Sequence, residues 1–453
     1  MTTGGSGIAR ALARAPISAP VHGFRTGAEF DLYRGVKNML RCDEADVVRN
    51  IADYVISQHR ALGLLSGLIE WNRDGVIPGL VALTGWLRAF TSIQSPAGSS
   101  DCAWIARLSN ERRAIESMCC FAGDLSWTEL KFGLVPDLAT LRWLGMNLAP
   151  QRILKLTRHL HRRHEFFKVL RVIEFIAYYT RYLEIFQTGR FKLAVTSNHS
   201  NPHGVAFNLA ARKHGVPVVL ITHGMPVRPV ARLAYDLAVV HCEAARQTYL
   251  EEGCRISRVL VHGRRRQYQP MPTQGLPQKL TVGIFLCKDV NEVRLKDLIA
   301  ELMNQREVSR VIIRPHPKNL WRGLNNWIAT LNNERVRLTV EQSVLSDTEG
   351  VDLVLAGNSS VLVDAVTAGR PSGYVFGLDH APRDMHRFVR EGLIYPLEDR
   401  PHAIQWNPRA ILAFYQRPEW LNTLRLFANI DDDDHEVAAQ ASRIIRELRN
   451  ESR

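Results

Sequence analysis

The chain has 453 residues, of which 46% are hydrophobic and 23% are charged, and its formal net charge is +13. A chain of this length exceeds the size at which a single hydrophobic core stops growing, so we expect two or more domains. The composition is that of an ordinary globular protein and excludes a disordered or membrane-embedded chain. The basic charge favours polyanionic partners such as nucleotides, nucleic acids or anionic lipids, without choosing among them.

The cysteines and the apolar stretches indicate a cytoplasmic protein. The seven cysteines show neither a CxxC pair nor the spacing of metal ligands, so we expect a reducing compartment, no disulfide and no zinc site. The first residues include arginines but no apolar segment typical of a signal peptide. The most apolar stretch, residues 169–186, is interrupted by charged side chains, so no transmembrane segment is predicted.

The first 190 residues carry a mostly helical pattern. Apolar residues stand three and four positions apart, for example at Val47, Ile51 and Val55, and strand-like runs are scarce. We therefore treat residues 1–190 as a helical N-terminal region that belongs to, or is appended to, the first α/β domain.

From residue 191 the pattern changes to alternating strands and helices. Such βαβ alternation predicts a parallel sheet, and residues 191–270 are predicted to form a Rossmann-like domain. The predicted strands are residues 193–197, 216–222, 235–241 and 258–262, with helices at 204–214 and 243–252.

A linker and a second α/β domain follow. Residues 267–279 hold three prolines and a glycine without apolar periodicity, which is typical of an interdomain linker. Residues 279–410 repeat the alternation and predict a complete doubly wound domain. Its predicted strands are residues 280–287, 310–313, 335–340, 352–355 and 372–376, with helices at 292–304, 320–331 and 360–368. Residues 411–453 are predicted to form a helical tail that ends in an amphipathic helix at 436–449.

A histidine directly follows a buried strand of the first α/β domain. The string ITHGMP occupies residues 221–226, immediately after Val218, Val219 and Leu220. Because ligands of open α/β sheets bind beyond the carboxyl ends of the strands, we expect the imidazole of His223 to point into a cleft. Gly224 would let the backbone turn sharply or approach a ligand closely. The alternative is a histidine that only hydrogen-bonds a loop, and the position at a strand end favours the functional role.

A rigid basic turn follows a strand of the second domain. In the string RPHPK, residues 314–318, two prolines restrict the loop, while Arg314, His316 and Lys318 present groups suited to phosphate. The alternative is a solvated basic turn, but such a turn does not need a histidine between two prolines. We therefore expect a phosphate-binding loop here.

A helix start follows another strand of the second domain. The string AGNSS, residues 356–360, leads into the helix predicted at residues 360–368. A helix N-terminus offers unsatisfied N–H groups and partial positive charge, and the hydroxyls of Ser359 and Ser360 add donors. We therefore expect a phosphate-binding site here. The alternative is an ordinary N-cap, which serine supplies in many helices. Asn358 joins the two serines as a candidate binding residue.

The three clusters together resemble those of known transferases. The string THGMP resembles the histidine-glycine motif of the CDP-glycerol glycerophosphotransferases, and RPHP and GNSSVLVDAVTAGRP resemble the paired motifs of their second domain. HP followed by Ser-Ser is also similar to the bacterial polysialyltransferases and other capsule enzymes that use CMP-sugars. The resemblance covers about residues 191–395. It implies an α/β fold of the GT-B type, with two Rossmann-like doubly wound domains facing a cleft and a helical N-terminal elaboration.

The resemblance also implies roles for these residues. His316, Ser359 and Ser360 would contact the phosphate of the donor in the second domain, and His223 would be the base in the first, acceptor-binding domain. The chain departs from both families, because Gly357-Asn358 replaces an acidic and aromatic pair and Thr348-Glu349-Gly350 matches only part of an acidic-acidic-glycine motif. The donor therefore stays open among CMP-, CDP- and UDP-linked sugars. Glu349 is kept as a substrate-binding residue and second candidate base.

The implied reaction is transfer of a sugar to a surface glycan or lipid-linked acceptor, without metal or cofactor. Basic side chains and a helix start would replace the metal, and the acidic run at residues 431–434 opens a helix rather than following a strand. The alternatives are a glycerophosphotransferase-type polymerase, a sugar-nucleotide epimerase on the same fold, and a non-catalytic nucleic-acid-binding protein. Only the net charge supports the last, since no recognisable binding motif accompanies it.

The segment from Arg152 to Arg171 is a candidate membrane contact. It carries seven Lys or Arg against the single Glu165, with apolar residues on one face. Such a basic amphipathic helix can lie on anionic lipid at the inner face of a membrane. A solvated helix that packs on its own domain explains the pattern equally well.

Overall fold

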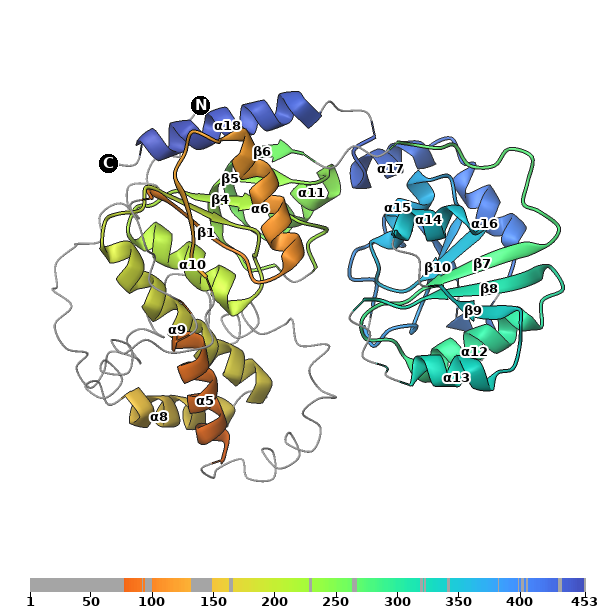
Figure 1. Ribbon diagram of the computed structural model, residues 1–453, viewed down its shortest axis with the longest axis horizontal. Helices are drawn as coiled ribbons and strands as arrows, with labels where there is room; N and C mark the ends of the chain where they lie inside the picture. Colours follow the sequence, from red (N-terminus) through yellow and green to blue (C-terminus); the bar gives the residue numbers. More distant parts are fainter. Residues whose placement is uncertain are drawn as a thin grey trace, which may run out of the picture.

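The computed structural model describes residues 77–131 and 149–451, apart from gaps at 92, 94–99, 163–165, 228–229, 263–266, 318–320, 322, 340–342, 382, 398, 401–402, 405 and 431–433. The helical pattern around Val47, Ile51 and Val55 lies outside the described residues. Two α/β units follow one another along the chain, each built on a six-stranded parallel sheet (Figure 1). This confirms the expected fold class of two doubly wound domains.

The sheet of the first domain has the order β2-β1-β3-β4-β5-β6, and all its strand pairs are parallel. Two of its strands come from the N-terminal region, for which a mostly helical structure was expected. They were missed because they are only three and four residues long and β1 is buried along its whole length, so it shows no alternation. The strands are β1 (Cys102–Ile105), β2 (Trp127–Glu129), β3 (Leu193–Thr196), β4 (Val218–Ile221), β5 (Ala234–Val240) and β6 (Arg255–Val261).

Helices cover both faces of this first sheet, which explains the uninterrupted apolar runs in β3 and β4. One face packs on α9 and α10, and α9 in turn packs on α5 and α8. The other face packs on α6 and on the last helix of the chain, α18. The helices of this domain are α5 (Ile77–Thr91), α6 (Ser109–Phe121), α8 (Ala149–His161), α9 (Phe166–Gln187), α10 (Pro202–Lys213) and α11 (Glu243–Glu251).

The sheet of the second domain has the order β12-β11-β10-β7-β8-β9 and is also parallel throughout. The five predicted strands of this domain are confirmed as β7 to β11, and β12 adds an edge strand. The strands are β7 (Leu280–Phe285), β8 (Val308–Arg314), β9 (Val336–Leu338), β10 (Leu353–Ala356), β11 (Ser372–Val375) and β12 (Tyr395–Leu397), followed by the hairpin β13 (Asp399–Arg400) and β14 (Ala403–Ile404). The helices are α12 (Glu292–Met303), α13 (Leu324–Thr330), α14 (Val344–Glu349), α15 (Val361–Thr367) and α16 (Pro408–Tyr415).

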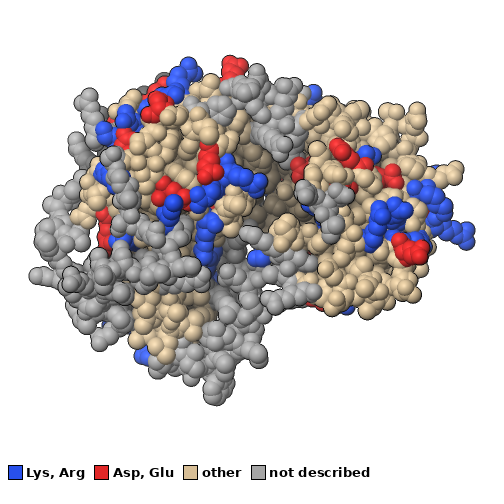
Figure 2. Space-filling model, viewed as in Figure 1, with Lys and Arg blue, Asp and Glu red and all other residues tan. Residues whose placement is uncertain are grey.

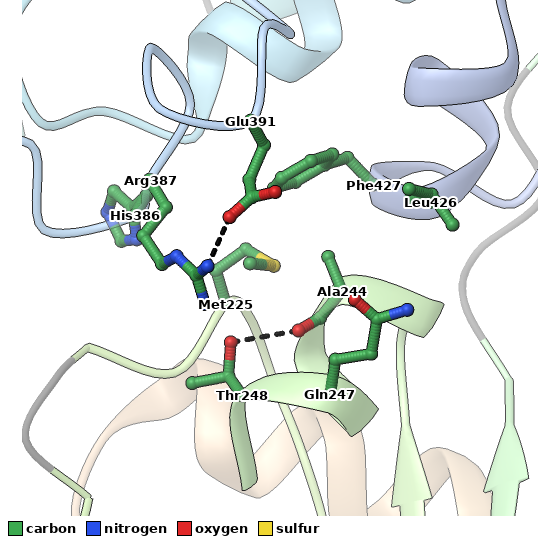
Figure 3. A pocket seen from close by; sticks show the side chains of 9 residues that line it. All are labelled: Met225, Ala244, Gln247, Thr248, His386, Arg387, Glu391, Leu426 and Phe427. Carbon is green, nitrogen blue, oxygen red and sulfur yellow. Dashed lines mark hydrogen bonds and ion pairs between the residues drawn. The ribbon is translucent and has the colours of Figure 1, made fainter. Parts of the chain in front are cut away.

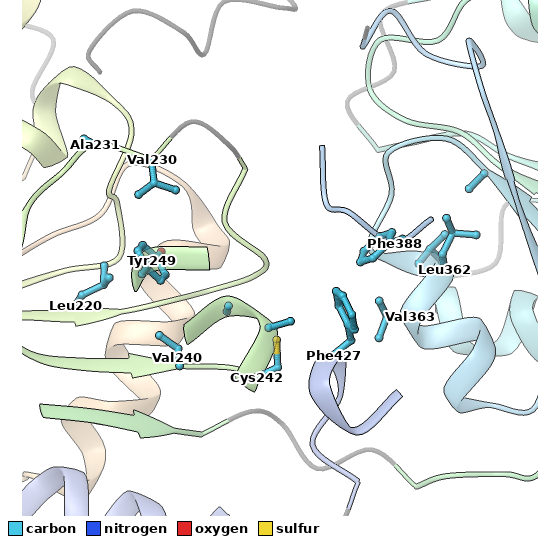
Figure 4. Packing of buried hydrophobic residues seen from close by; sticks show 14 of the residues in the cluster. Leu220, Val230, Ala231, Val240, Cys242, Tyr249, Leu362, Val363, Phe388 and Phe427 are labelled. Atoms are coloured by element: carbon cyan, nitrogen blue, oxygen red, sulfur yellow. The ribbon is translucent and has the colours of Figure 1, made fainter. Parts of the chain in front are cut away.

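The end of the chain ties the two domains together. Helix α17 (Trp420–Phe427) contacts α15 of the second domain and α11 of the first, and the ring of Phe427 lies 5.7 Å from that of Phe388 (Figure 4). Helix α18 (Asp434–Glu451) then returns to the first domain, along whose sheet it lies in Figure 1. There Arg449 binds Asp101, so the tail belongs to both domains.

Candidate functional site

A pocket lies between the two domains, where loops from the carboxyl ends of strands in both sheets meet. The first domain contributes Met225, which follows β4, and residues of α11, while the second contributes the segment after β11 and the end of α17 (Figure 3). Figure 2 shows the molecular surface hollowed between the two domains. The lining residues are Met225, Ala244, Gln247, Thr248, His386, Arg387, Glu391, Leu426 and Phe427.

An ion pair crosses between the domains beside this pocket. Arg387 donates from Nη1 to Glu251 Oε2 of α11 at 2.6 Å, and its Nη2 binds Glu391 within the second domain. The backbone φ of Arg387 is +63°, a left-handed conformation that non-glycine residues seldom adopt. Strain of this kind persists only where surrounding contacts hold it, and the two ion pairs are such contacts.

His223 lies at the carboxyl end of β4, where the sequence predicted it, and its side chain is exposed. Its Nδ1 lies 3.2 Å from the backbone oxygen of Ser197 and 2.9 Å from the hydroxyl oxygen of the same residue. A carbonyl oxygen can only accept a hydrogen bond, whereas a hydroxyl can donate or accept one, so both contacts can be hydrogen bonds at the same time only in the tautomer with the proton on Nδ1. The lone pair is then on Nε2, which can accept a proton from a ligand.

The surroundings of His223 keep its ring neutral at neutral pH. Loss of water around the ring lowers its pKa below the ordinary value, while the carboxylate of Glu111 and the hydrogen bond to Ser197 act in the opposite direction. A neutral imidazole is the form that a general base requires. The ring is therefore in the right state to take a proton.

Gly224 does not make the sharp turn that was one of the two roles expected from the sequence, and the other role, close approach to a ligand, stays a prediction. Its φ is not in the left-handed region, and a Cβ atom built on it would meet nothing within 4 Å. The backbone here does not need glycine for a sharp turn. What the structure offers beside His223 at this position is open space.

A polar cluster that was not predicted from the sequence lies after β3. Glu111, in the first turn of α6, is fully buried, and its carboxylate accepts hydrogen bonds from the backbone N–H groups of Arg107 and Leu108, at 2.7 and 3.1 Å, and from Asn198 Nδ2 at 2.7 Å. Asn198 directly follows Ser197, which holds His223. The string Thr-Ser-Asn at the end of a predicted strand could have drawn attention to Ser197 and Asn198, but nothing local connects Glu111 with them.

His199 continues this cluster into the interior. Its Nδ1 lies 2.7 Å from the hydroxyl of Tyr249, and burial lowers its pKa to about 3, with the neighbouring His223 acting in the same direction. His199 is therefore neutral at neutral pH and adds no positive charge beside His223.

In the second domain, Asn358 serves the fold rather than a ligand. Its amide donates to Asp379 Oδ1 and to the backbone oxygen of Arg383, both at 3.1 Å, and accepts from the backbone N–H of Met385 at 2.7 Å. A Cβ atom on Gly357 would come within 2.2 Å of the Asp379 carboxylate, so glycine is needed for this close approach. We therefore correct the expectation that Asn358 binds substrate, because its amide is occupied in joining the loops after β10 and β11.

Ser359 and Ser360 lie at the carboxyl end of β10, next to β7, where the strand order of this sheet reverses. Ser359 is half-buried, and its hydroxyl accepts weakly from the backbone N–H of Val361 at 3.4 Å. Ser360 is exposed and makes no side-chain bond to the helix that it caps. Both hydroxyls keep hydrogen-bonding capacity, and switch points are where open α/β sheets bind ligands.

The basic turn after β8 only partly keeps its expected role. The guanidinium of Arg314 forms an ion pair with the buried Asp347 and donates to the backbone oxygen of Ser343 at 3.2 Å, so it is committed within the domain and is no longer a phosphate candidate. His316 follows β8 as expected and is half-buried. Lys318 lies outside the described residues.

Glu349 is not part of the site. It is the last residue of α14, it is exposed, and four residues later β10 begins. It therefore lies at the amino edge of the sheet, whereas Ser359 and Ser360 lie at the carboxyl edge. The sequence motif could not distinguish these edges, and the expectation that Glu349 binds substrate was wrong.

The basic segment from Arg152 to Arg171 forms parts of two helices, α8 and α9. The apolar side chains of Leu156 and Leu160 are buried in the core. Arg171 is buried as well and donates to Asn201 Oδ1 at 2.7 Å. The apolar face that would enter a lipid surface is thus covered by protein, as in the alternative of a helix that packs on its own domain. None of the helices in the described part of the chain is long and apolar enough to cross a membrane.

No group of three or more His, Cys, Asp or Glu side chains gathers as potential metal ligands among the residues described. The interdomain pocket instead presents the imidazole of His386 and the hydroxyl of Thr248.

Comparisons with known proteins give only distant likenesses. No protein-family model and no curated protein sequence matches the chain. Among solved structures, the UDP co-structure of MnaA from S. aureus is 12% identical over 78% of this chain and 96% of that chain, with a TM-score of 0.40. A glycosyltransferase from Rickettsia africae gives 9% identity, coverages of 79% and 100%, and a TM-score of 0.42. UDP-GlcNAc 2-epimerase from Neisseria meningitidis, bound to UDP-GlcNAc, is 12% identical over 77% of this chain and 98% of that chain, with a TM-score of 0.39. At these scores the likenesses carry no argument about the activity of this chain.

Proposed function

We propose that this chain is a sugar-nucleotide-dependent glycosyltransferase in which His223 is the base. The observation that carries the proposal is the pairing of His223 Nδ1 with the backbone oxygen of Ser197, which leaves Nε2 as the proton acceptor at the carboxyl edge of the first sheet. Met225, two residues further on, lines the interdomain pocket. The acceptor hydroxyl therefore enters from the first domain.

The donor binds at the switch point of the second domain. The hydroxyls of Ser359 and Ser360 and the imidazole of His316 hold the phosphate next to the sugar, because all three follow the carboxyl ends of strands β8 and β10. Their hydrogen bonds strengthen as negative charge develops on the leaving nucleotide. Arg314, Asn358 and Glu349 have no place in this binding site.

The reaction is a direct displacement. Nε2 of His223 takes the proton from the acceptor hydroxyl, the acceptor oxygen forms a bond to the anomeric carbon, and the bond from that carbon to the phosphate oxygen breaks. The electron pair of the broken bond stays on the phosphate, which leaves as the nucleotide, and the histidine returns its proton to solvent. The nucleotide is CMP, CDP or UDP, and the acceptor is a surface glycan or a lipid-linked glycan.

A nucleotide screen tests the proposal. The protein is incubated with CMP, CDP, UDP and a DNA duplex, and its thermal transition is recorded, because a ligand that binds only the folded state raises this temperature. The matching sugar nucleotides are then supplied with and without glycan acceptors, and nucleotide release is measured. We expect stabilisation by one nucleotide and acceptor-dependent release that is lost in His223→Ala.

The other outcomes separate the alternatives. An isomerised sugar nucleotide formed without acceptor would identify an epimerase, and consumption of CDP-glycerol alone would identify a glycerophosphotransferase. Stabilisation by the duplex only would refute an enzymatic role. Attachment to a membrane through the segment from Arg152 to Arg171 is not part of the proposal, because Leu156 and Leu160 are buried in the protein.

A further inference from the structure

A buried carboxylate lies near His223 and has no role in the mechanism proposed above. Glu111 is 0% exposed, and no Lys or Arg side chain forms an ion pair with it in the part of the chain that the structure describes. Acidic residues are almost never buried without a partner, and the removal of a charge from water is costly. Glu111 caps the start of α6, where its side chain accepts from the backbone of Leu108, and the same carboxylate also reaches Asn198 in the loop that holds His223.

Hydrogen bonds hold the carboxylate in one position. Its Oε2 accepts from the backbone N–H groups of Arg107 and Leu108 at the start of α6, and its Oε1 accepts from Asn198. Three hydrogen bonds hold the carboxylate in place, and a negative charge is favourable at the start of a helix. Glu111 is thus a fixed negative charge at the boundary between β1 and β3, where the strand order of the first sheet reverses.

A short chain of contacts leads from Glu111 to His223. Asn198, which donates to Glu111, also accepts from the backbone N–H of Asn201 at 2.8 Å, so its amide orientation is fixed. Its sequence neighbour Ser197 holds Nδ1 of His223. The carboxylate therefore orients the segment that orients the imidazole.

We propose that Glu111 is a positioning residue that sets the basicity of His223. The inference rests on the proposed function of His223 as base. When Nε2 takes the proton of the acceptor, the ring becomes an imidazolium, and a fixed negative charge nearby stabilises that cation. Without this charge, no described carboxylate near the ring would counteract the lowering of the pKa of His223 by loss of water. The histidine would then be too weak a base.

The other groups that face His223 do not supply this effect. Ser197 is neutral, and it contributes only hydrogen bonds to Nδ1, through its hydroxyl and its backbone oxygen. His199, from the same loop, bonds Tyr249 of α11 and is itself neutral, with a pKa of about 3. Glu111 is therefore the ionised group, among the described neighbours, that favours the protonated form of His223.

The test compares Glu111→Gln with Glu116→Gln. Glu116 lies on the same helix, but its side chain is exposed, so this control removes one charge without touching the cluster. The pKa of His223 is measured by NMR titration of its ring in each full-length protein, with His223→Ala used to assign the signal. We expect Glu111→Gln to lower the pKa of His223 by roughly one unit and Glu116→Gln to leave it unchanged. An unchanged pKa in Glu111→Gln would overturn the inference.

The pH dependence of turnover separates this inference from the proposed function. If His223 is the base, the acidic limb of the turnover profile moves to lower pH in Glu111→Gln by the same amount as the NMR pKa. If the NMR pKa moves and the turnover profile does not, Glu111 acts on His223 but His223 is not the base. An equal loss of turnover at every pH, with no change in the pKa, would indicate a merely structural role and refute the positioning role.

A measurement on the unaltered protein covers the case in which Glu111→Gln fails to fold. The side-chain carboxyl carbons of glutamate are labelled with ¹³C, and the signal of Glu111 is followed through the pH range in which His223 titrates. We expect the shift of an ionised carboxylate throughout that range. A protonated Glu111 in that range would overturn the proposal, because a neutral carboxyl group cannot stabilise the imidazolium in this way.

Discussion

The buried histidine next to the proposed base predicts a specific loss of stability in acid. His199 is buried beside Tyr249 and has a pKa of about 3 in the folded protein, against an ordinary value of about 6.5. The perturbation is a fall in pH, compared between the natural protein and His199→Asn. The asparagine amide can still accept from the Tyr249 hydroxyl but takes up no proton.

The sign and size of the effect follow from the two pKa values. Above about pH 6.5 His199 is neutral in both states and contributes no pH dependence. Below that pH, His199 binds a proton in the unfolded chain but stays neutral in the folded protein. The free energy of unfolding therefore falls as the pH drops towards about 3. The loss approaches about 1.4 kcal/mol per pH unit, or about 2 kcal/mol between pH 6.5 and pH 5.

Urea denaturation followed by circular dichroism at pH 7, 6 and 5 measures this loss. The natural protein should lose about 2 kcal/mol more than His199→Asn between pH 7 and pH 5, since the other titrating groups are common to both. His214→Asn serves as the control, because His214 is exposed in the first domain and should give a smaller difference. Equal losses in the natural protein and His199→Asn would refute the assignment of a buried, neutral His199.

Three further predictions concern the site. His316→Ala should weaken nucleotide affinity and slow turnover together, because a charge-assisted contact contributes about 1.5 to 3 kcal/mol. His223→Ala should keep nucleotide affinity and lower turnover by roughly a hundredfold or more. Calorimetry and turnover assays on the same preparations measure both quantities, and near-normal turnover in His223→Ala would remove this histidine from the mechanism. EDTA should leave transfer activity largely intact, and complete loss restored by magnesium or manganese would contradict this. Arg387→Gln should break the ion pair with Glu251 between the domains. The radius of gyration measured by small-angle X-ray scattering should therefore increase, while the circular dichroism spectrum stays the same. An unchanged radius of gyration would show that the packing of α17 alone holds the domains together.

The alternation of strands and helices from residue 191 onward, and the ends of most strands, could be predicted from the sequence alone. These features depend on near neighbours along the chain, because a buried parallel strand needs a continuous apolar run and a helix needs a periodic one. Since ligands bind beyond the carboxyl ends of such strands, the same pattern was enough to bring His223, His316, Ser359 and Ser360 forward as candidates.

Which polar groups are occupied and which are available depends on contacts between distant parts of the chain, and these could not be predicted from the sequence. Arg314 was predicted to bind phosphate, but in the fold it forms an ion pair with the buried Asp347. Glu349 was predicted from a sequence motif, but the direction of β10 places it at the opposite edge of the sheet from Ser359 and Ser360. Glu111 and Asn198 lie 87 positions apart in the chain, yet they share a hydrogen bond of 2.7 Å. Local propensity carries no information about contacts of this range, since they arise from the packing of β1 beside β3, and that pairing decided how the proposed base is held.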